Sequence, residues 1–186
     1  MAISLQKGSS FNLTKKEPAL KKIMIGLGWE MTQGQKLDLD ASVFMLASNG
    51  KLVGEEYFVF FNNLKSGDGS VQHTGDNRTG AGDEDDEMIL VNLPIVNSAV
   101  KDILVTVSIH EAAARRHSFG LLQNAYIRIV DVETKREVLR YDLDAEFGNN
   151  TDVEFGKLHN ENGEWHFTAV GVGSNKGLEG YVNAFA

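Results

Sequence analysis

The chain contains no cysteine and only two prolines among its 186 residues. The absence of cysteine excludes disulfides, thiolate zinc sites, iron–sulfur clusters and cysteine nucleophiles. No apolar run approaches the roughly 18 residues of a membrane-spanning helix. The first residues, Met1–Lys7, lack the apolar stretch of a secretory signal. We therefore expect no membrane span and no signal peptide, which is compatible with a reducing cytoplasm.

Positive charge is also scarce, since the formal net charge is −8 and the isoelectric point is near 5.1. Binding to nucleic-acid phosphates would need a local basic patch against that negative field. The only candidate is a group of four lysines that resembles a solvated strand flank: Lys15, Lys16, Lys21 and Lys22. We expect no nucleic-acid partner.

The length and apolar content indicate one globular domain over residues 1–186. Apolar runs are short and rich in β-branched and aromatic residues, with turn residues between them. Such spacing predicts an all-β fold, a β-sandwich of two antiparallel or mixed sheets with a few short helices. The predicted strands are Ile23–Leu27, Val43–Leu46, Tyr57–Phe61, Met88–Val91, Ile103–Ile109, Tyr126–Val130 and Trp165–Val170.

Helical patterning is limited to two short segments, Glu111–Arg116 and Leu178–Phe185. The segment Leu64–Glu87 has almost no apolar pattern. A structureless connection longer than about 12–15 residues is uncommon in a compact domain unless it is functional or disordered. This segment is therefore where we expect a function.

Within that segment, six carboxylates fall in the twelve residues from Asp76 to Glu87, and only Arg78 opposes their charge. Interspersed glycines allow the backbone to turn tightly and direct its carbonyls inward. Calcium binds six to eight hard oxygen donors at roughly 2.3–2.6 Å in loose geometry. The acidic run predicts a calcium site, and the alternative is a solvated acidic loop.

A second acidic pair, Asp38 and Asp40, leads into the apolar run at Val43. On a strand the two aspartates share one face, opposite Leu39. Their Cα atoms then lie about 6–7 Å apart, a spacing that suits two ligands of one ion or a bridge between two. The alternative is a solvent-facing strand edge. Downstream, Asn62 and Asn63 supply amide oxygens but are also common turn residues.

Known site templates do not fit. The calcium loop of EF-hands fails because Arg78 occupies the third position after Asp76, and Val43 occupies the glycine position after Asp38. His110 lacks the second histidine of a zinc-protease helix, since residue 114 is alanine. The glycine-rich segment 171–177 matches neither nucleotide-binding fingerprint. No nucleophile with an adjacent base is recognisable.

Together the motifs resemble the TerD family of tellurium-resistance and stress proteins. The resemblance spans nearly the whole chain, and its most specific part is His73–Asn77 with the acidic triplet Asp85–Glu87. Small departures include Glu30, where aspartate is common. The matching segments are Gly26–Trp29, Leu37–Ser42, Phe60–Leu64, Gly69–Gly80, Asp85–Glu87, Ile109–Ala112, Asn124–Arg128, Tyr141–Leu143, Phe155–Gly156 and Glu164–Trp165.

The resemblance implies a cytoplasmic bacterial β-sandwich that binds calcium, without established catalysis. Because the acids exceed the needs of a single ion, we expect two neighbouring Ca²⁺ ions. It also implies other tellurium-resistance proteins as partners and allows a peripheral membrane complex. Which acid among residues 83–87 binds is left open. The expected ligands are Asp38, Asp40, Asn62, Asn63, Asp76, Asn77, Thr79, Gly80, Asp85, Asp86 and Glu87.

Two alternatives remain. The same carboxylates could hold Mg²⁺ or Mn²⁺ in a metal-dependent phosphohydrolase. Only Lys65 and Arg78 lie near them in sequence as cations for a substrate phosphate. The second alternative is a purely structural calcium site with a partner surface elsewhere.

Overall fold

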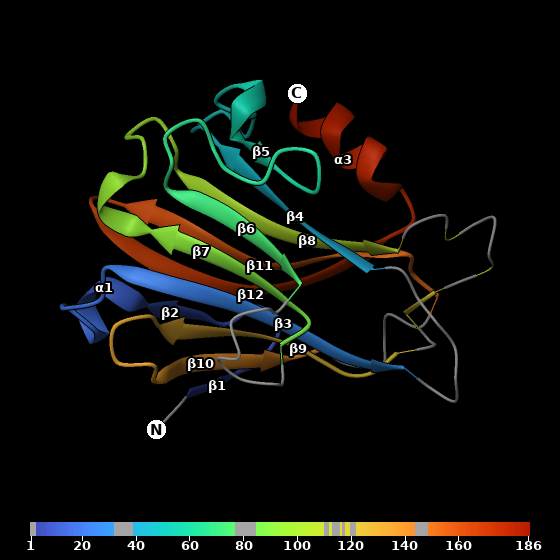
Figure 1. The fold of residues 1–186 in the computed structure, drawn as a ribbon, viewed down its shortest axis with the longest axis horizontal. Helices are drawn as coiled ribbons and strands as arrows, with labels where there is room; N and C mark the ends of the chain where they lie inside the picture. The colour runs from blue at the N-terminus through green and yellow to red at the C-terminus, as the bar shows by residue number, and fades with distance from the viewer. Residues whose placement is uncertain are drawn as a thin grey trace.

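The computed structural model describes residues 3–31, 39–76, 85–109, 112, 116, 118–119, 122–143 and 149–186. Its strands form two six-stranded sheets that pack face to face as a sandwich (Figure 1). Neighbouring described strands run antiparallel, except that β1 pairs with β10 in parallel. The predicted fold class, a β-sandwich of mixed sheets with few short helices, is confirmed.

The strand order of each sheet mixes segments that are distant in sequence. The first sheet contains β1 (Ile3–Leu5), β10 (Glu137–Asp142), β9 (Leu122–Asp131), β3 (Lys22–Met31), β7 (Glu87–Asn92) and β6 (Val71–Asp76), in that order. The second sheet contains β2 (Ser10–Asn12), β12 (Glu164–Ser174), β11 (Asp152–Glu161), β8 (Asp102–Ile109), β4 (Leu39–Leu46) and β5 (Phe58–Val59). The helical segments are α1 (Leu13–Lys16), η1 (Glu55–Tyr57), η2 (Leu93–Ile95) and α3 (Gly177–Phe185).

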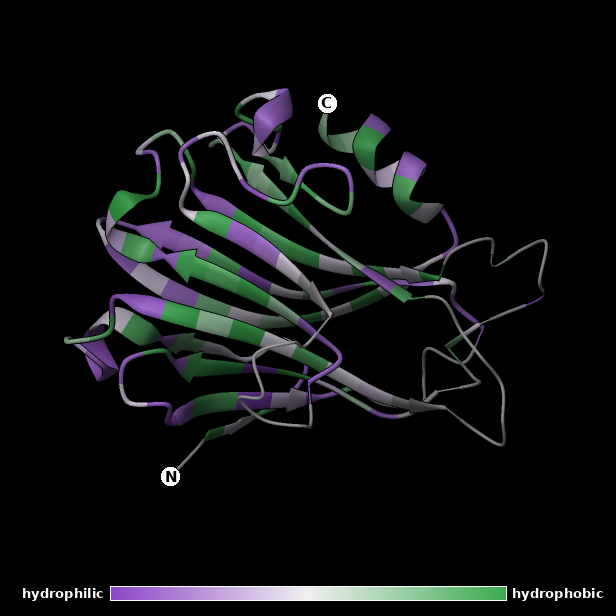
Figure 2. Cartoon of the chain, in the orientation of Figure 1, coloured by the Kyte–Doolittle hydropathy of each residue, from purple (hydrophilic) through white to green (hydrophobic). Residues whose placement is uncertain are grey.

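The main core lies between the two sheets. Successive side chains of a strand point to opposite faces, so every second residue enters the core. Figure 2 shows the resulting apolar and polar alternation along several strands. The face predicted for β8 is confirmed, because Ile103, Val105, Val107 and Ile109 all belong to the main core.

The other face of β8 is also buried, because α3 packs on the outer side of the second sheet (Figure 1). Tyr181 of α3 is fully buried against Phe44 and Leu104. The buried carboxylate of Asp152 accepts the N–H of Gly177 at 2.7 Å, which caps the start of α3. The predicted helix Leu178–Phe185 is confirmed.

Two predictions for the middle of the chain are wrong. The segment Leu64–Glu87 is not free of structure, because Val71–Asp76 form β6 and the inward-facing Val71 is fully buried. The predicted strand Tyr57–Phe61 shortens to β5, because Tyr57 belongs to η1 and Phe60–Asn63 form a turn. Most of the predicted helix Glu111–Arg116 lies outside the described residues.

Candidate metal centre

The structure describes only part of the predicted ligand set. Outside the described residues lie Asp38, Asn77, Thr79 and Gly80. Within them lie Asp40 on β4, Asn62 and Asn63 after β5, Asp76 at the end of β6, Asp85 and Asp86 before β7, and Glu87 at the start of β7.

Glu87 brings two of the predicted ligand segments together. Its Oε2 accepts the backbone N–H of Ala41 at 2.7 Å, and Ala41 directly follows Asp40 on β4 of the other sheet. The buried ring of His73 lies beside the same carboxylate, with Nε2 3.5 Å from Oε2. In the backbone register, Asp76 of β6 lies opposite Glu87. Three acidic segments therefore meet at one end of the sandwich.

Asp40 is half-buried and lies on the outer face of the second sheet, in register with Ser108 of β8. Its neighbours in sequence, Leu39 and Ala41, both enter the main core. The predicted separation of the two faces of this strand is therefore confirmed for residues 39–41.

Asp86 joins the acidic segment to the first sheet. Its Oδ2 accepts the N–H of Trp29 at 2.8 Å, and its own N–H donates to the carbonyl of Leu27 at 2.7 Å. Partial burial raises the pKa of Asp86, and the nearby charges of Asp85 and Glu87 add to this, while the Trp29 N–H opposes it. A bound cation would relieve this repulsion.

Asp85 differs from the other two acids of the triplet because its carboxylate is fully buried and paired. Arg128 of β9 donates from Nη2 to Oδ2 at 2.6 Å and from Nε to Oδ1 at 3.0 Å. The hydroxyl of Tyr126 donates to Oδ1 at 2.8 Å. The hydrogen bond to Asp85 and the negative charge of Asp85 raise the pKa of Arg128 above its usual value. Both oxygens of Asp85 therefore already accept protein donors.

The two asparagines occupy a turn. The Asn63 side-chain amide donates to the carbonyl of Phe58 at 2.8 Å and more weakly to that of Glu56 at 3.4 Å. Backbone bonds between Phe60 and Asn63 close the turn, and Asn62 is exposed within it. The amide nitrogen of Asn63 therefore stabilises the turn, and these hydrogen bonds do not involve its amide oxygen.

The donor chemistry at this end of the sandwich fits calcium better than a soft metal, because the candidate ligands are all oxygens. In the described part of the chain, no three histidine, aspartate or glutamate side chains converge to hold a metal ion. A complete site would need backbone carbonyls, or further ligands from residues 32–38 and 77–84.

Sequence reasoning missed Arg128 and Tyr126 as members of this region. The sequence carries no signal for the ion pair, because an arginine between Ile127 and Ile129 is the ordinary alternation of a half-buried strand. That pattern predicts a solvent-facing Arg128, and it does not identify a partner acid.

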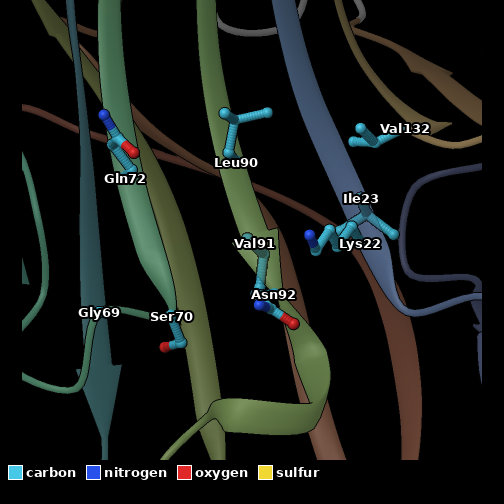
Figure 3. Close-up of a pocket in the computed structure, with 9 residues that line it drawn as sticks. All are labelled: Lys22, Ile23, Gly69, Ser70, Gln72, Leu90, Val91, Asn92 and Val132. Carbon is cyan, nitrogen blue, oxygen red and sulfur yellow. The ribbon is translucent and has the colours of Figure 1, made fainter.

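A hollow of about 200 Å³ opens elsewhere, on the first sheet (Figure 3). It lies over the start of β3 and the end of β7, where Lys22, Leu90 and Val132 line it. None of the predicted ligands lines it. In the described residues, no helix is long and apolar enough to cross a membrane.

Comparison with known proteins agrees with the motifs. The TerD domain model matches residues 1–185. Tellurium resistance protein TerD of Serratia marcescens is 51% identical over 180 residues, covering 96% of this chain and 94% of that protein. General stress protein 16U of Bacillus subtilis is 46% identical over 181 residues, with coverage of 96% and 94%.

A solved structure has the same fold at low sequence identity. A homologue of telluride resistance protein from Streptomyces coelicolor superposes with a TM-score of 0.68 at 21% identity, covering 88% of this chain and 96% of that one. The domain match and the close relatives cover nearly the whole length. The chain therefore belongs to the TerD family, whose members are named for tellurium resistance and general stress.

Proposed function

We propose that this chain is a calcium-binding, non-catalytic module of a bacterial tellurium-resistance or stress-response system. The observation that carries the proposal is the hydrogen bond from Ala41 N–H to Glu87 Oε2 at 2.7 Å. It joins the two acidic segments that the sequence marks as ligand sources. It places the carboxylate of Glu87 beside the strand that carries Asp40, and a cation between acidic segments would offset their mutual repulsion.

The proposed ligands are the carboxylates of Asp40, Asp86 and Glu87, with Asp76 at the end of β6. From the sequence we add the following residues outside the described ranges: Asp38, Asn77, Thr79 and Gly80. The surplus of carboxylates over the needs of one ion supports two Ca²⁺ ions. Asn62 and Asn63 would contribute amide oxygens if their turn lies within reach.

The cellular setting is also a proposal. The relatives include proteins named TerD, TerZ and TerX in Serratia marcescens. Other tellurium-resistance proteins are therefore the partners we propose, in the cytoplasm and including a peripheral complex at the membrane. Calcium at the acidic end would set the charge of the surface that such a partner meets.

Titration calorimetry on chelator-stripped protein tests the proposal. Ca²⁺ should bind more tightly than Mg²⁺, because Mg²⁺ demands rigid octahedral geometry and loses its water reluctantly. Two equivalents of Ca²⁺ are expected. Mg²⁺ binding as tight as Ca²⁺ binding would favour the metal-dependent phosphohydrolase instead, and no binding of either ion would refute a metal site.

Chelation gives a second test, through stability. A ligand present at a hundredfold excess over its dissociation constant stabilises the folded state by about 2.7 kcal/mol. Adding chelator should lower the melting temperature and speed proteolysis within residues 65–87. A melting temperature and cleavage pattern unaffected by chelator would leave the acidic run as a solvated loop.

A further inference from the structure

The carboxylate of Asp85 occupies a place that two glycines leave open on the outer face of the first sheet. A Cβ on Gly26 would lie 2.6 Å from Asp85 Oδ1, far inside van der Waals contact. A Cβ on Gly28 would lie 2.4 Å from the ring of Tyr126, whose hydroxyl binds the same carboxylate. The absence of a side chain at Gly26 and Gly28 therefore leaves room for the side chains of Asp85 and Tyr126 on this face.

Strand register explains how the partners meet. Gly26 of β3 lies opposite Arg128 of β9 on one side and opposite Met88 of β7 on the other. The three residues share one face of the sheet. Asp85, two residues before β7 begins at Glu87, folds back over Gly26 to reach Arg128.

The ion pair is shielded from water. The Asp85 side chain is fully buried, and that of Arg128 is only 15% exposed. On the same face, Met24, Met88 and Val130 form a small buried apolar cluster. A carboxylate in such surroundings requires a paired cation, and removing one partner leaves the other charge buried without compensation.

The direction of the chain after Asp85 determines where the next two acids point. Asp86 reaches the N–H of Trp29 on β3, and Glu87 reaches the N–H of Ala41 in the opposite sheet. Three consecutive acids therefore leave the backbone toward three different partners. Among the described residues, a guanidinium pairs with the first of them, Asp85.

We propose that Arg128 is a positioning residue for the calcium site, and that Asp85 is its anchor rather than a calcium ligand. The pair fixes the chain at Asp85, so that Asp86 and Glu87 present their carboxylates at the acidic end of the sandwich. This inference rests on the proposed function. A calcium ion at Asp85 would have to approach the Arg128 guanidinium and compete with it and with Tyr126 for the same two oxygens.

The experiment compares Arg128→Gln, Arg128→Lys, Asp85→Asn and the double variant Arg128→Gln/Asp85→Asn. Arg136→Gln serves as the matched control, because Arg136 pairs with Glu17 at the exposed surface. Two quantities are measured: calcium affinity by calorimetry, and the backbone amide shifts of Trp29 and Ala41 by NMR in chelator. The amide shifts report the hydrogen bonds to Asp86 and Glu87 directly.

We expect Arg128→Gln to weaken calcium binding on the order of tenfold or more, as loss of an outer-sphere partner does at other metal sites. The Trp29 and Ala41 amides should shift, Arg128→Lys should restore part of the affinity, and Arg136→Gln should change neither quantity. The double variant should bind calcium about as well as Arg128→Gln, because both changes break the same contact. It also removes the unpaired buried charge, so it keeps the test usable if Arg128→Gln fails to fold.

Other outcomes would overturn the positioning role of Arg128. If Asp85 is a ligand, Asp85→Asn weakens binding while the Trp29 and Ala41 amides stay in place, and Arg128→Gln tightens binding by removing a competing cation. Unmoved Trp29 and Ala41 amides in Arg128→Gln would also overturn the inference. If the parent protein binds no calcium, the proposed function fails, and the amide shifts in chelator still decide whether Arg128 positions the two acids.

Discussion

Glu87 of β7 accepts the backbone N–H of Ala41 on β4 at 2.7 Å, and this bond links the two sheets of the sandwich. β4 pairs with β8 along its whole length, but with β5 only at Val43 and Phe44. Glu87 therefore takes the place that a neighbouring strand would fill beside Ala41. A carboxylate in this position serves the fold and the proposed ion site together.

The two roles of Glu87 can be separated by two substitutions. Glu87→Ala leaves the N–H of the buried Ala41 without its acceptor, and we expect a loss of about 1–3 kcal/mol in the free energy of unfolding. Glu87→Gln keeps an acceptor oxygen and should retain most of that stability. Both variants should lose calcium affinity. Urea unfolding in chelator and calorimetry measure the two effects, and equal stability losses in both variants would contradict the assigned hydrogen bond.

Gly26 gives a second prediction. In Gly26→Ala the added methyl overlaps the Asp85 carboxylate, and we expect the substitution to destabilise the protein by about 1–3 kcal/mol. The cost should be smaller when Gly26→Ala is made in an Asp85→Ala background, because the overlapping group is gone. A double-mutant cycle on unfolding free energies measures this coupling. Simple additivity would mean that the two residues do not share this space.

The region around Gly26 also shows what sequence alone can predict. The apolar runs at β3 and β9 and the acidic triplet are visible in the sequence, and so is the alternation that separates their faces. The order β9-β3-β7 is not, because it depends on non-local packing between segments about 60 and 100 residues apart. Without that order, Asp85 reads as one more acid of the loop rather than as the partner of Arg128.

The missed strands have local physical causes. Val71 and His73 are the buried residues among the part of β6 whose burial is described, and only Val71 of them is apolar, so the strand shows little apolar alternation. In β11, a register shift between Glu154 and Gly156 interrupts the period of two that a sequence search relies on. In the described segments, Glu87 of β7 reaches the backbone of β4 beside Asp40, and the ligand roles of all the predicted residues stay predictions.

Asp68 should make the protein sensitive to acid. Burial by itself would raise the pKa of Asp68, but hydrogen bonds from Ser66, Asn97 and Ser70 outweigh it and lower the pKa. A folded-state pKa below that of the unfolded chain adds stability at neutral pH. That contribution is lost as pH falls from about 4, the ordinary aspartate range, through the lowered value.

Asp68→Ala tests this contribution. The variant loses the hydrogen bonds that Asp68 accepts from the Asn97 N–H at 2.8 Å and the Ser70 hydroxyl at 2.7 Å. We expect the free energy of unfolding to fall by about 1.5–3 kcal/mol at pH 7. The difference from the parent should shrink as pH falls below about 4. Chemical unfolding at several pH values measures it. A difference that stays constant down to pH 2 would show that the charge of Asp68 is not responsible.

Thr106 gives a prediction of the opposite sign. Its Oγ1 is buried, and no hydrogen-bond partner is found for it in the described part of the chain. Replacing a buried unpaired hydroxyl by a methyl of similar shape removes a desolvation cost. Thr106→Val should therefore be neutral or stabilise the protein by about 1 kcal/mol in thermal unfolding. A clear loss of stability would reveal a bound water or a partner from residues outside the described ranges.

Substitutions at the adjacent β4 residues Asp40 and Leu39 should affect calcium affinity and folding stability differently. Asp40 is half-buried on the outer face, whereas Leu39 is 6% exposed and belongs to the main core. Leu39→Asn should lower the unfolding free energy by about 2–4 kcal/mol with or without calcium, because it buries an amide and loses apolar contact. Asp40→Asn should cost less stability in chelator.

Calcium affinity should respond in the reverse order. Asp40→Asn removes a full negative charge from a partly dehydrated site, and we expect at least about a tenfold loss, equivalent to about 1.4 kcal/mol. Leu39→Asn, measured at a temperature where it remains folded, should bind calcium nearly as well as the parent. An Asp40→Asn variant with the affinity of the parent would remove β4 from the site. The segment from Asp76 to Glu87 would then have to bind calcium without β4.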